Sequence, residues 1–177
     1  MKRTILGIIL FLCLQVVKAQ NNNSVQKPVL SVEVVSIKDF NNVVYSSNKK
    51  LKIVYFFKRG CSANAEAMPK INIFYKTQKS NIDLFVVSFA NKNNKQDLKD
   101  HFFFEGYYTP VYIIDDSAIF NNKKYRKVVE NLCDDCDQKS MGYGDFFVLD
   151  QNDQLIVQSN YNQNLEEKIN LLKSQVN

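Results

Sequence analysis

The chain alternates short apolar runs with longer segments in which apolar residues recur at helical spacing. Three runs are apolar at nearly every position, as expected of strands covered on both faces of a sheet; they span residues 51–57, 82–89 and 110–115. Four segments have apolar residues three or four positions apart and predict helices; they span residues 62–78, 97–104, 122–134 and 165–176. Strands that alternate with helices favour an α/β or α+β fold, with a central mixed sheet flanked by helices.

Two hairpins complete the predicted sheet. Residues 30–37 alternate loosely between apolar and polar, and a polar turn at 39–42 separates them from a short return strand at 43–45. Near the other end of the chain, residues 146–150 and 155–159 flank a Gln-Asn-Asp turn. The sequence therefore predicts an N-terminal β-hairpin ahead of the first buried strand, and a second hairpin before the last helix.

The first nineteen residues predict a secretory signal peptide. A basic start is followed by an apolar run at residues 5–17, which is short for a membrane span, and Ala19 offers a small residue for cleavage. Leu12 precedes Cys13 where lipid attachment requires a small residue, which argues against a lipoprotein. We therefore expect a periplasmic or secreted protein with no stable membrane span after cleavage of residues 1–19.

The rest of the chain is expected to form one domain. Residues 20–29 are polar and predict a flexible linker, so the domain is assigned to residues 30–177. Loss of the signal peptide lowers the formal net charge from +5 to about +2. The remaining basic residues form no stripe along the sequence, so nucleic acid is not an expected partner.

Cys61 has the clearest chemical signal in the sequence. It follows the apolar run 51–57 and precedes the predicted helix 62–78, which places its sulfur near the free N–H groups and the positive end of that helix. Both features favour the thiolate form of a cysteine. Lys58 and Arg59 add positive charge beside it. The sequence thus predicts a nucleophilic thiol with two activating cations.

The stretch from Phe56 to Lys70, Phe-Phe-Lys-Arg-Gly-Cys-Ser-Ala-Asn-Ala-Glu-Ala-Met-Pro-Lys, resembles without gaps the active-site segment of the thioredoxin-like superfamily, TlpA-like and redoxin branch. That segment contains a Trp, a Cys-x-x-Cys motif and Met-Pro four residues later. Met68-Pro69 is in register, whereas Gly60 replaces the aromatic and Asn64 the second cysteine. The resemblance covers residues 30–176. It implies a thioredoxin-like fold and thiol–disulfide exchange, with Asn64 at the position of the lost resolving cysteine.

The resemblance also implies a cis-proline facing the active cysteine. Pro110, in a Thr-Pro dipeptide ahead of a predicted strand, is one candidate position. Gly144 is the other, and this alignment fits better because the final hairpin and helix follow it. In that alignment a glycine has replaced the proline.

Cys133 and Cys136 form a second pair, Cys-Asp-Asp-Cys, at the end of a predicted helix. Three interpretations are open: a local structural disulfide of an exported protein, a displaced resolving pair for Cys61, or two idle thiols. A metal site is not expected, because zinc normally takes four ligands and the chain has one such pair and a single histidine, His101.

An aromatic segment follows His101. Its members are Phe102, Phe103, Phe104, Tyr107 and Tyr108. Such a cluster usually belongs to the core, and the alternative is a surface that binds an extended partner peptide.

Taken together, these patterns predict an exported thioredoxin-fold protein, oxidoreductase-like, with Cys61 as nucleophile. Its expected partners are protein thiols or disulfides of the cell envelope, and no cofactor is implied. The alternative is a redox-inactive thioredoxin-fold module that binds envelope proteins, which Gly60 and Asn64 support because both depart from the reactive motif.

Overall fold

A six-stranded mixed sheet runs through the computed structural model, which describes residues 30–115 and 121–176. The predicted signal peptide at 1–19 and the predicted linker at 20–29 lie outside the described residues. The strands are β1 (Val32–Val35), β2 (Leu51–Phe57), β3 (Ile82–Ser88), β4 (Val111–Ile114), β5 (Phe146–Asp150) and β6 (Leu155–Gln158). Their order is β1-β4-β3-β2-β5-β6. The first four strands in this order are parallel, whereas β5 is antiparallel to both β2 and β6.

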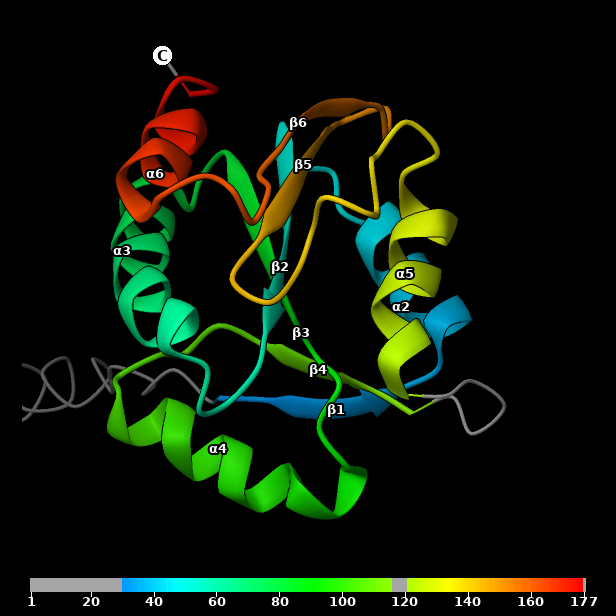
Figure 1. Cartoon of the computed structure of the whole chain (residues 1–177), viewed down its shortest axis with the longest axis vertical. Helices are drawn as coiled ribbons and strands as arrows, with labels where there is room; N and C mark the ends of the chain where they lie inside the picture. The colour runs from blue at the N-terminus through cyan, green and yellow to red at the C-terminus, as the bar shows by residue number, and fades with distance from the viewer. Residues whose placement is uncertain (1–29, 116–120, 177) are drawn as a thin grey trace, which may run out of the picture.

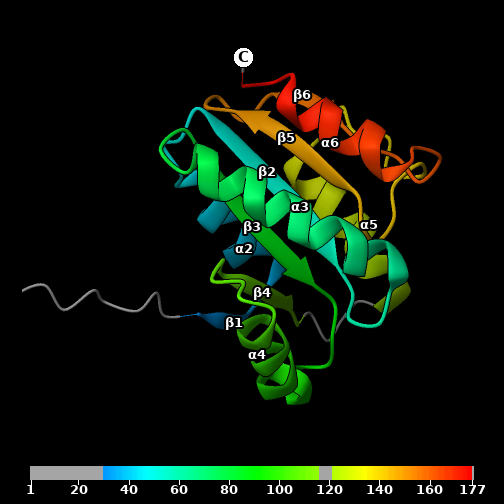
Figure 2. The ribbon, with the colours of Figure 1, turned by 90° about the vertical axis from the view of Figure 1, so that its left-hand side faces the viewer.

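Helices cover both faces of this sheet (Figure 1). They are α2 (Ile37–Tyr45), α3 (Ser62–Gln78), α4 (Lys95–Phe104), α5 (Asn121–Leu132) and α6 (Leu165–Lys173), with a 3-10 turn at Lys92–Asn94. Figure 2 shows α3 and α6 in front of the strands, with α2 and α5 behind them. The described part of the chain contains no helix that is both long and apolar enough to cross a membrane.

β2 is at the centre of the molecule because both of its faces are apolar. All seven of its residues are buried. Tyr55 and Phe57 belong to the core under α3, α4 and α6, whereas Val54 and Phe56 belong to the core under α2 and α5. The nearly continuous apolar run in the sequence therefore reflects two separate cores, one on each face.

The predicted N-terminal hairpin is wrong. Residues Ile37–Tyr45 form helix α2, and β1 pairs in parallel with β4. Ser36 caps this helix, since its hydroxyl accepts a hydrogen bond from the Asp39 amide at 3.1 Å. Phe40 and Val44 are fully buried beneath it. A helix at this position buries one apolar face against the sheet, which a three-residue return strand would not do.

The other predicted elements are present with small changes at their ends. Helix α3 covers the predicted range 62–78, and β5 and β6 form the predicted second hairpin. The aromatic segment after His101 is divided between core and surface. Phe102 and Tyr107 are buried, whereas Phe103, Phe104 and Tyr108 are exposed, so the core interpretation holds for two of the five aromatic residues.

Candidate functional site

Cys61 lies where the central strand passes into helix α3. A tight turn with Gly60 at φ +78° follows β2, and the Cys61 amide donates to the Lys58 carbonyl at 3.2 Å. Cys61 is the N-cap residue of α3, and its own carbonyl accepts from the amides of Asn64 at 3.0 Å and Ala65 at 3.2 Å. The cysteine is therefore at the positive end of the helix, as its place in the sequence predicts.

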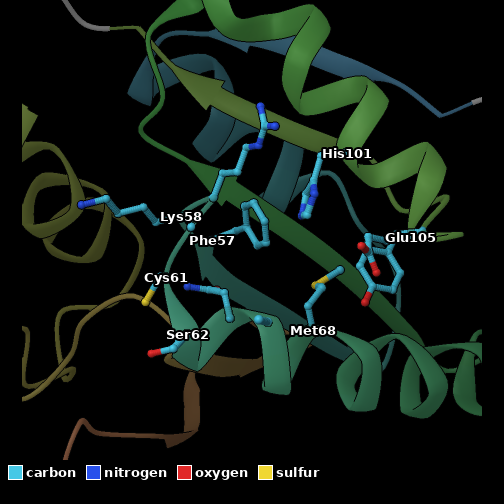
Figure 3. A pocket seen from close by; sticks show the side chains of 12 residues that line it. Phe57, Lys58, Cys61, Ser62, Met68, His101 and Glu105 are labelled. Carbon is cyan, nitrogen blue, oxygen red and sulfur yellow. The ribbon is translucent and has the colours of Figure 1, made fainter.

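The thiol is partly exposed and is the free cysteine of the described residues. Figure 3 shows its sulfur on the same side of the turn as the Lys58 side chain. The Lys58 ammonium lies 5.1 Å from the centre of the Tyr143 ring, a cation–π contact. Arg59 is more than half exposed, and its guanidinium lies 3.9 Å from the Asp97 carboxylate. Both cations line the same cavity as Cys61, and each has a contact with another side chain.

Asn64, which the sequence resemblance aligns with a resolving cysteine, is a buried residue with a specific partner. Its side chain is 1% exposed, and its Oδ1 accepts a hydrogen bond from the Tyr55 hydroxyl at 2.7 Å. Its Nδ2 makes no hydrogen bond with any residue that the structure describes. Burial raises the pKa of Tyr55 well above its ordinary value, and nearby charge at Cys61 and Asp145 raises it further. Tyr55 therefore stays protonated and acts as the donor.

Gly144 lies against the turn that carries the thiol. Its φ is +89°, its amide donates to the Phe56 carbonyl at 2.8 Å, and a Cβ at this position would come within 3.2 Å of the Ala63 methyl. Pro110 lies elsewhere, at the amino-terminal end of β4, whereas Cys61 follows the carboxyl end of the parallel strand β2. No peptide bond among the described residues is cis. Of the two candidate positions, the fold brings Gly144 next to the active-site stretch.

A buried carboxylate fixes the loop that contains Gly144. Asp145 is 1% exposed, and its Oδ1 lies 2.6 Å from the Lys168 ammonium of α6 and accepts from the Ser159 hydroxyl at 2.8 Å. Its Oδ2 accepts from the Gly142 amide at 2.8 Å. Each carboxylate oxygen thus has a donor, as a buried charge requires. No sequence motif marks Asp145 or Lys168, so this cluster could not be predicted from the sequence.

Cys133 and Cys136 are joined to each other by a disulfide, with Cα atoms 5.4 Å apart. Cys133 is buried in the core beneath α2 and α5, at the end of helix α5. This pairing agrees with the interpretation of the two cysteines as a local disulfide. In this state neither sulfur is available as a resolving thiol for Cys61.

A cavity of about 410 Å³ opens beside Cys61, between the start of α3 and helix α4. Figure 3 shows Cys61 and Lys58 at one end and Glu105 at the other, with Phe57, Met68 and His101 between them. The His101 ring lies 5.8 Å from the Phe57 ring. No group of three or more potential metal ligands occurs within residues 30–115 and 121–176. The cavity is a mainly apolar hollow, with the Cys61 sulfur and charged groups among its lining residues.

Comparison with known proteins assigns the fold. Neither a protein-family model nor a curated protein matches the sequence. Among solved structures, a thioredoxin-family thiol:disulfide interchange protein from Chlorobium tepidum TLS is similar, with a TM-score of 0.53, 16% identity, and 72% of this chain and 80% of that chain covered. A thiol:disulfide interchange protein from Bacteroides sp. is similar with a TM-score of 0.52 and 16% identity, and the match covers 80% of this chain and 78% of that chain. StoA from Bacillus subtilis is similar with a TM-score of 0.50 and 13% identity, and the match covers 72% of this chain and 85% of that chain.

At these identities the likeness shows the fold. The chain has a thioredoxin-like fold, with a central mixed sheet flanked by helices, of the kind found in thiol:disulfide interchange proteins. This confirms the thioredoxin-like fold that the sequence resemblance implies.

Proposed function

We propose that this protein is an exported thiol–disulfide exchange protein that uses Cys61 as its single nucleophile. The observation that carries the proposal is the free Cys61 sulfur at the start of α3, with Lys58 and Arg59 beside it and the Gly144 loop against the turn. Helix N–H groups and nearby cations stabilise a thiolate at such a position. The partners are thiols or disulfides of proteins in the cell envelope.

The reaction begins when the Cys61 thiolate attacks a partner disulfide. A bond forms between Cys61 and one partner sulfur, the partner's S–S bond breaks, and the other sulfur leaves as a thiolate that takes a proton from water. Asn64 has no thiol to attack the mixed disulfide, so release requires a second thiol from another molecule or from elsewhere in this chain. Cys133 and Cys136 supply that thiol only after their own disulfide is reduced, which is the remaining form of the displaced-resolver hypothesis.

Export to the periplasm or the exterior is part of this proposal and rests on residues 1–19 of the sequence. An oxidising compartment also fits the Cys133–Cys136 disulfide. Sequencing of the amino terminus of the exported protein tests this part, with cleavage after Ala19 as the expected result.

A second candidate function is a redox-inactive module that binds envelope proteins. The Tyr55–Asn64 hydrogen bond favours it, because a buried amide with a fixed partner occupies the place of the resolving thiol. In this case Cys61 is a bystander and partner binding is not covalent.

Trapping in the cell envelope separates the two functions. A Cys133→Ser/Cys136→Ser variant keeps Cys61 as the free cysteine of the folded domain, and the matched control adds Cys61→Ser. We expect reductant-sensitive adducts with envelope proteins in the first variant and none in the control. Equal recovery of the same partners by both variants, without a covalent link, would instead support the binding module.

A further inference from the structure

Two hollows lie on either side of the turn that leads to Cys61. The first is the cavity of about 410 Å³ beside the thiol, and the second has a volume of about 340 Å³. The turn residues 58–60 line both hollows. Helices α3 and α4 line only the first, whereas the end of strand β3 and Tyr143 line only the second. The second hollow therefore opens between the reactive turn and the loop that contains Gly144.

The wall of the second hollow combines aromatic rings with positive charge. Phe89 and Tyr143 are both half-buried, and their ring centres are 6.2 Å apart. Lys58 and Arg59 supply two cations, and no carboxylate occurs among the described residues that line this hollow. The first hollow differs, because Glu105 lines it. The second hollow therefore favours a group that is apolar and carries negative charge.

Lys58 is the cation best placed to meet such a group. Its ammonium lies 5.1 Å from the centre of the Tyr143 ring and forms no ion pair with the residues that the structure describes. Arg59, in contrast, lies 3.9 Å from the Asp97 carboxylate. Figure 3 shows the Lys58 side chain on the same side of the turn as the Cys61 sulfur. A charge without a carboxylate partner beside the reacting sulfur is available to a carboxylate of an incoming protein.

On the basis that Cys61 is the nucleophile, we propose that Lys58 selects partner proteins with an Asp or Glu close to the reacting cysteine. An apolar side chain next to that acidic residue occupies the second hollow, against Phe89 and Tyr143. Successive residues of an extended segment are about 3.3 Å apart, so a carboxylate one or two positions from the partner cysteine reaches the neighbourhood of Lys58. Docking precedes the attack of Cys61 described above and adds no covalent step to it.

The test uses three disulfide probes on the mature protein with its Cys133–Cys136 disulfide intact. Each probe is an acetylated and amidated peptide whose cysteine carries a 2-thiopyridyl group. The Glu probe is Phe-Glu-Cys-Glu-Phe, the Gln probe has Gln in place of both Glu residues, and the Ser probe has Ser in place of both Phe residues. Attack of the Cys61 thiolate on the peptide sulfur breaks the S–S bond, and the leaving group takes a proton to become 2-thiopyridone, whose absorbance gives the rate. Each rate is divided by that of 2-mercaptoethanol with the same probe.

The expected preference is modest because the charges involved are exposed. At low salt we expect the normalised rate of the Glu probe to exceed that of the Gln probe by at least about threefold, the size of effect that one partly exposed ion pair supports. The preference should shrink at about 0.5 M sodium chloride, because salt screens exposed charges. The Ser probe should react more slowly than the Glu probe, because it has no apolar side chain to place in the second hollow.

Two variants locate the source of the preference. Lys58→Gln removes the charge, and Lys79→Gln is the matched control, because Lys79 is exposed and caps the end of helix α3 that is remote from Cys61. We expect Lys58→Gln to slow all three probes, since it also removes an activating charge, and to bring the rates of the Glu and Gln probes close together. Lys79→Gln should keep the natural ratio of these rates. Both side chains are exposed, so both variants should fold.

The outcomes separate the selection of partners from the chemistry of the thiol. Equal normalised rates for the Glu and Gln probes overturn the selection of acidic partners and leave Cys61 as a nucleophile. A preference that persists in Lys58→Gln, or that falls equally in Lys79→Gln, overturns the assignment to Lys58. Equal rates for the Glu and Ser probes overturn apolar binding in the second hollow. Failure of Cys61 to react with any probe overturns the proposed function and the selection together.

Discussion

Substitution of Tyr55 by Phe tests whether the buried Tyr55–Asn64 hydrogen bond holds the site together. Tyr55 is fully buried, and its hydroxyl is the partner of Asn64 Oδ1 at 2.7 Å. The ring stays in the core in the variant, so the change removes one hydroxyl and leaves a buried acceptor without a donor. Such a loss costs about 1–3 kcal/mol. For a domain of this size, about 2 kcal/mol corresponds to a fall in Tm of roughly 4–8 °C.

The measurement is equilibrium unfolding in urea at pH 7, with Tyr112→Phe as the matched control. Tyr112 is also a buried residue, at 7% exposure against 0% for Tyr55, and its hydroxyl makes no hydrogen bond to the residues that the structure describes. We expect the control to change the free energy of unfolding by less than about 1 kcal/mol, because it removes a hydroxyl without stranding a partner.

A double-mutant cycle makes the reasoning refutable. Asn64→Leu alone leaves the Tyr55 hydroxyl without its acceptor. The double variant, Tyr55→Phe with Asn64→Leu, removes both polar groups and leaves neither of them buried without a partner. The double variant should therefore be more stable than the sum of the single losses predicts, by about 1–2 kcal/mol. Additivity within about 0.5 kcal/mol would mean that the two side chains are not coupled, which would refute a stabilising Tyr55–Asn64 hydrogen bond.

Three further predictions follow from the structure. Gly144→Ala should lower the free energy of unfolding by about 1 kcal/mol or more beyond the loss in Gly106→Ala, as measured by thermal unfolding. Both glycines have positive φ, but only a Cβ at Gly144 would crowd the Ala63 methyl. Equal losses in the two variants would contradict this. Burial, with nearby acidic groups, raises the pKa of Tyr112 to about 12. The unfolded chain therefore loses the Tyr112 proton at lower pH than the folded protein, and the free energy of unfolding falls by about 1.4 kcal/mol per pH unit between pH 10 and 12. The urea midpoint plotted against pH should fall less steeply in Tyr112→Phe, and an unchanged slope would refute the assignment. Reduction of the Cys133–Cys136 disulfide should lower the free energy of unfolding by only about 2 kcal/mol, because the loop that it closes is short. Urea titrations with and without reductant measure this difference. Loss of the fold on reduction would mean that the disulfide stabilises the protein by more than loop closure explains.

Local sequence order was enough to place Cys61. A buried apolar run followed directly by a helical pattern puts the intervening residue at the start of a helix, whatever the rest of the chain does. Helix α3 has the range that its periodicity predicts, and the strands β2 and β3 were recognisable because each is covered on two faces.

The error at α2 came from treating polar residues as a turn. Asn41 and Asn42 were interpreted as the tip of a hairpin, yet they lie in the middle of a helix. Ile37, Phe40 and Val44 are spaced three and four apart, which is the signal for one buried helical face. A nine-residue segment with only three such positions fits both patterns, and burial against the sheet decides between them.

The hydrogen bonds of the site could not be predicted because they depend on tertiary packing. Asn64 was identified only as a lost cysteine, since nothing in the sequence says that Tyr55 points toward α3 and not toward the opposite face of β2. The pairing of Asp145 with Lys168 depends on where the last helix docks, 23 residues further along the chain.

That docking makes the last helix a structural support of the turn that carries Cys61. Lys168 of α6 neutralises Asp145, and Asp145 follows the glycine that lies against Ala63, two residues after the thiol. Displacement of α6, for instance by an affinity tag fused close behind it, would leave a buried carboxylate unpaired and loosen the loop opposite the sulfur. Thiol reactivity measured on such a fusion would then report the attachment as much as the native protein.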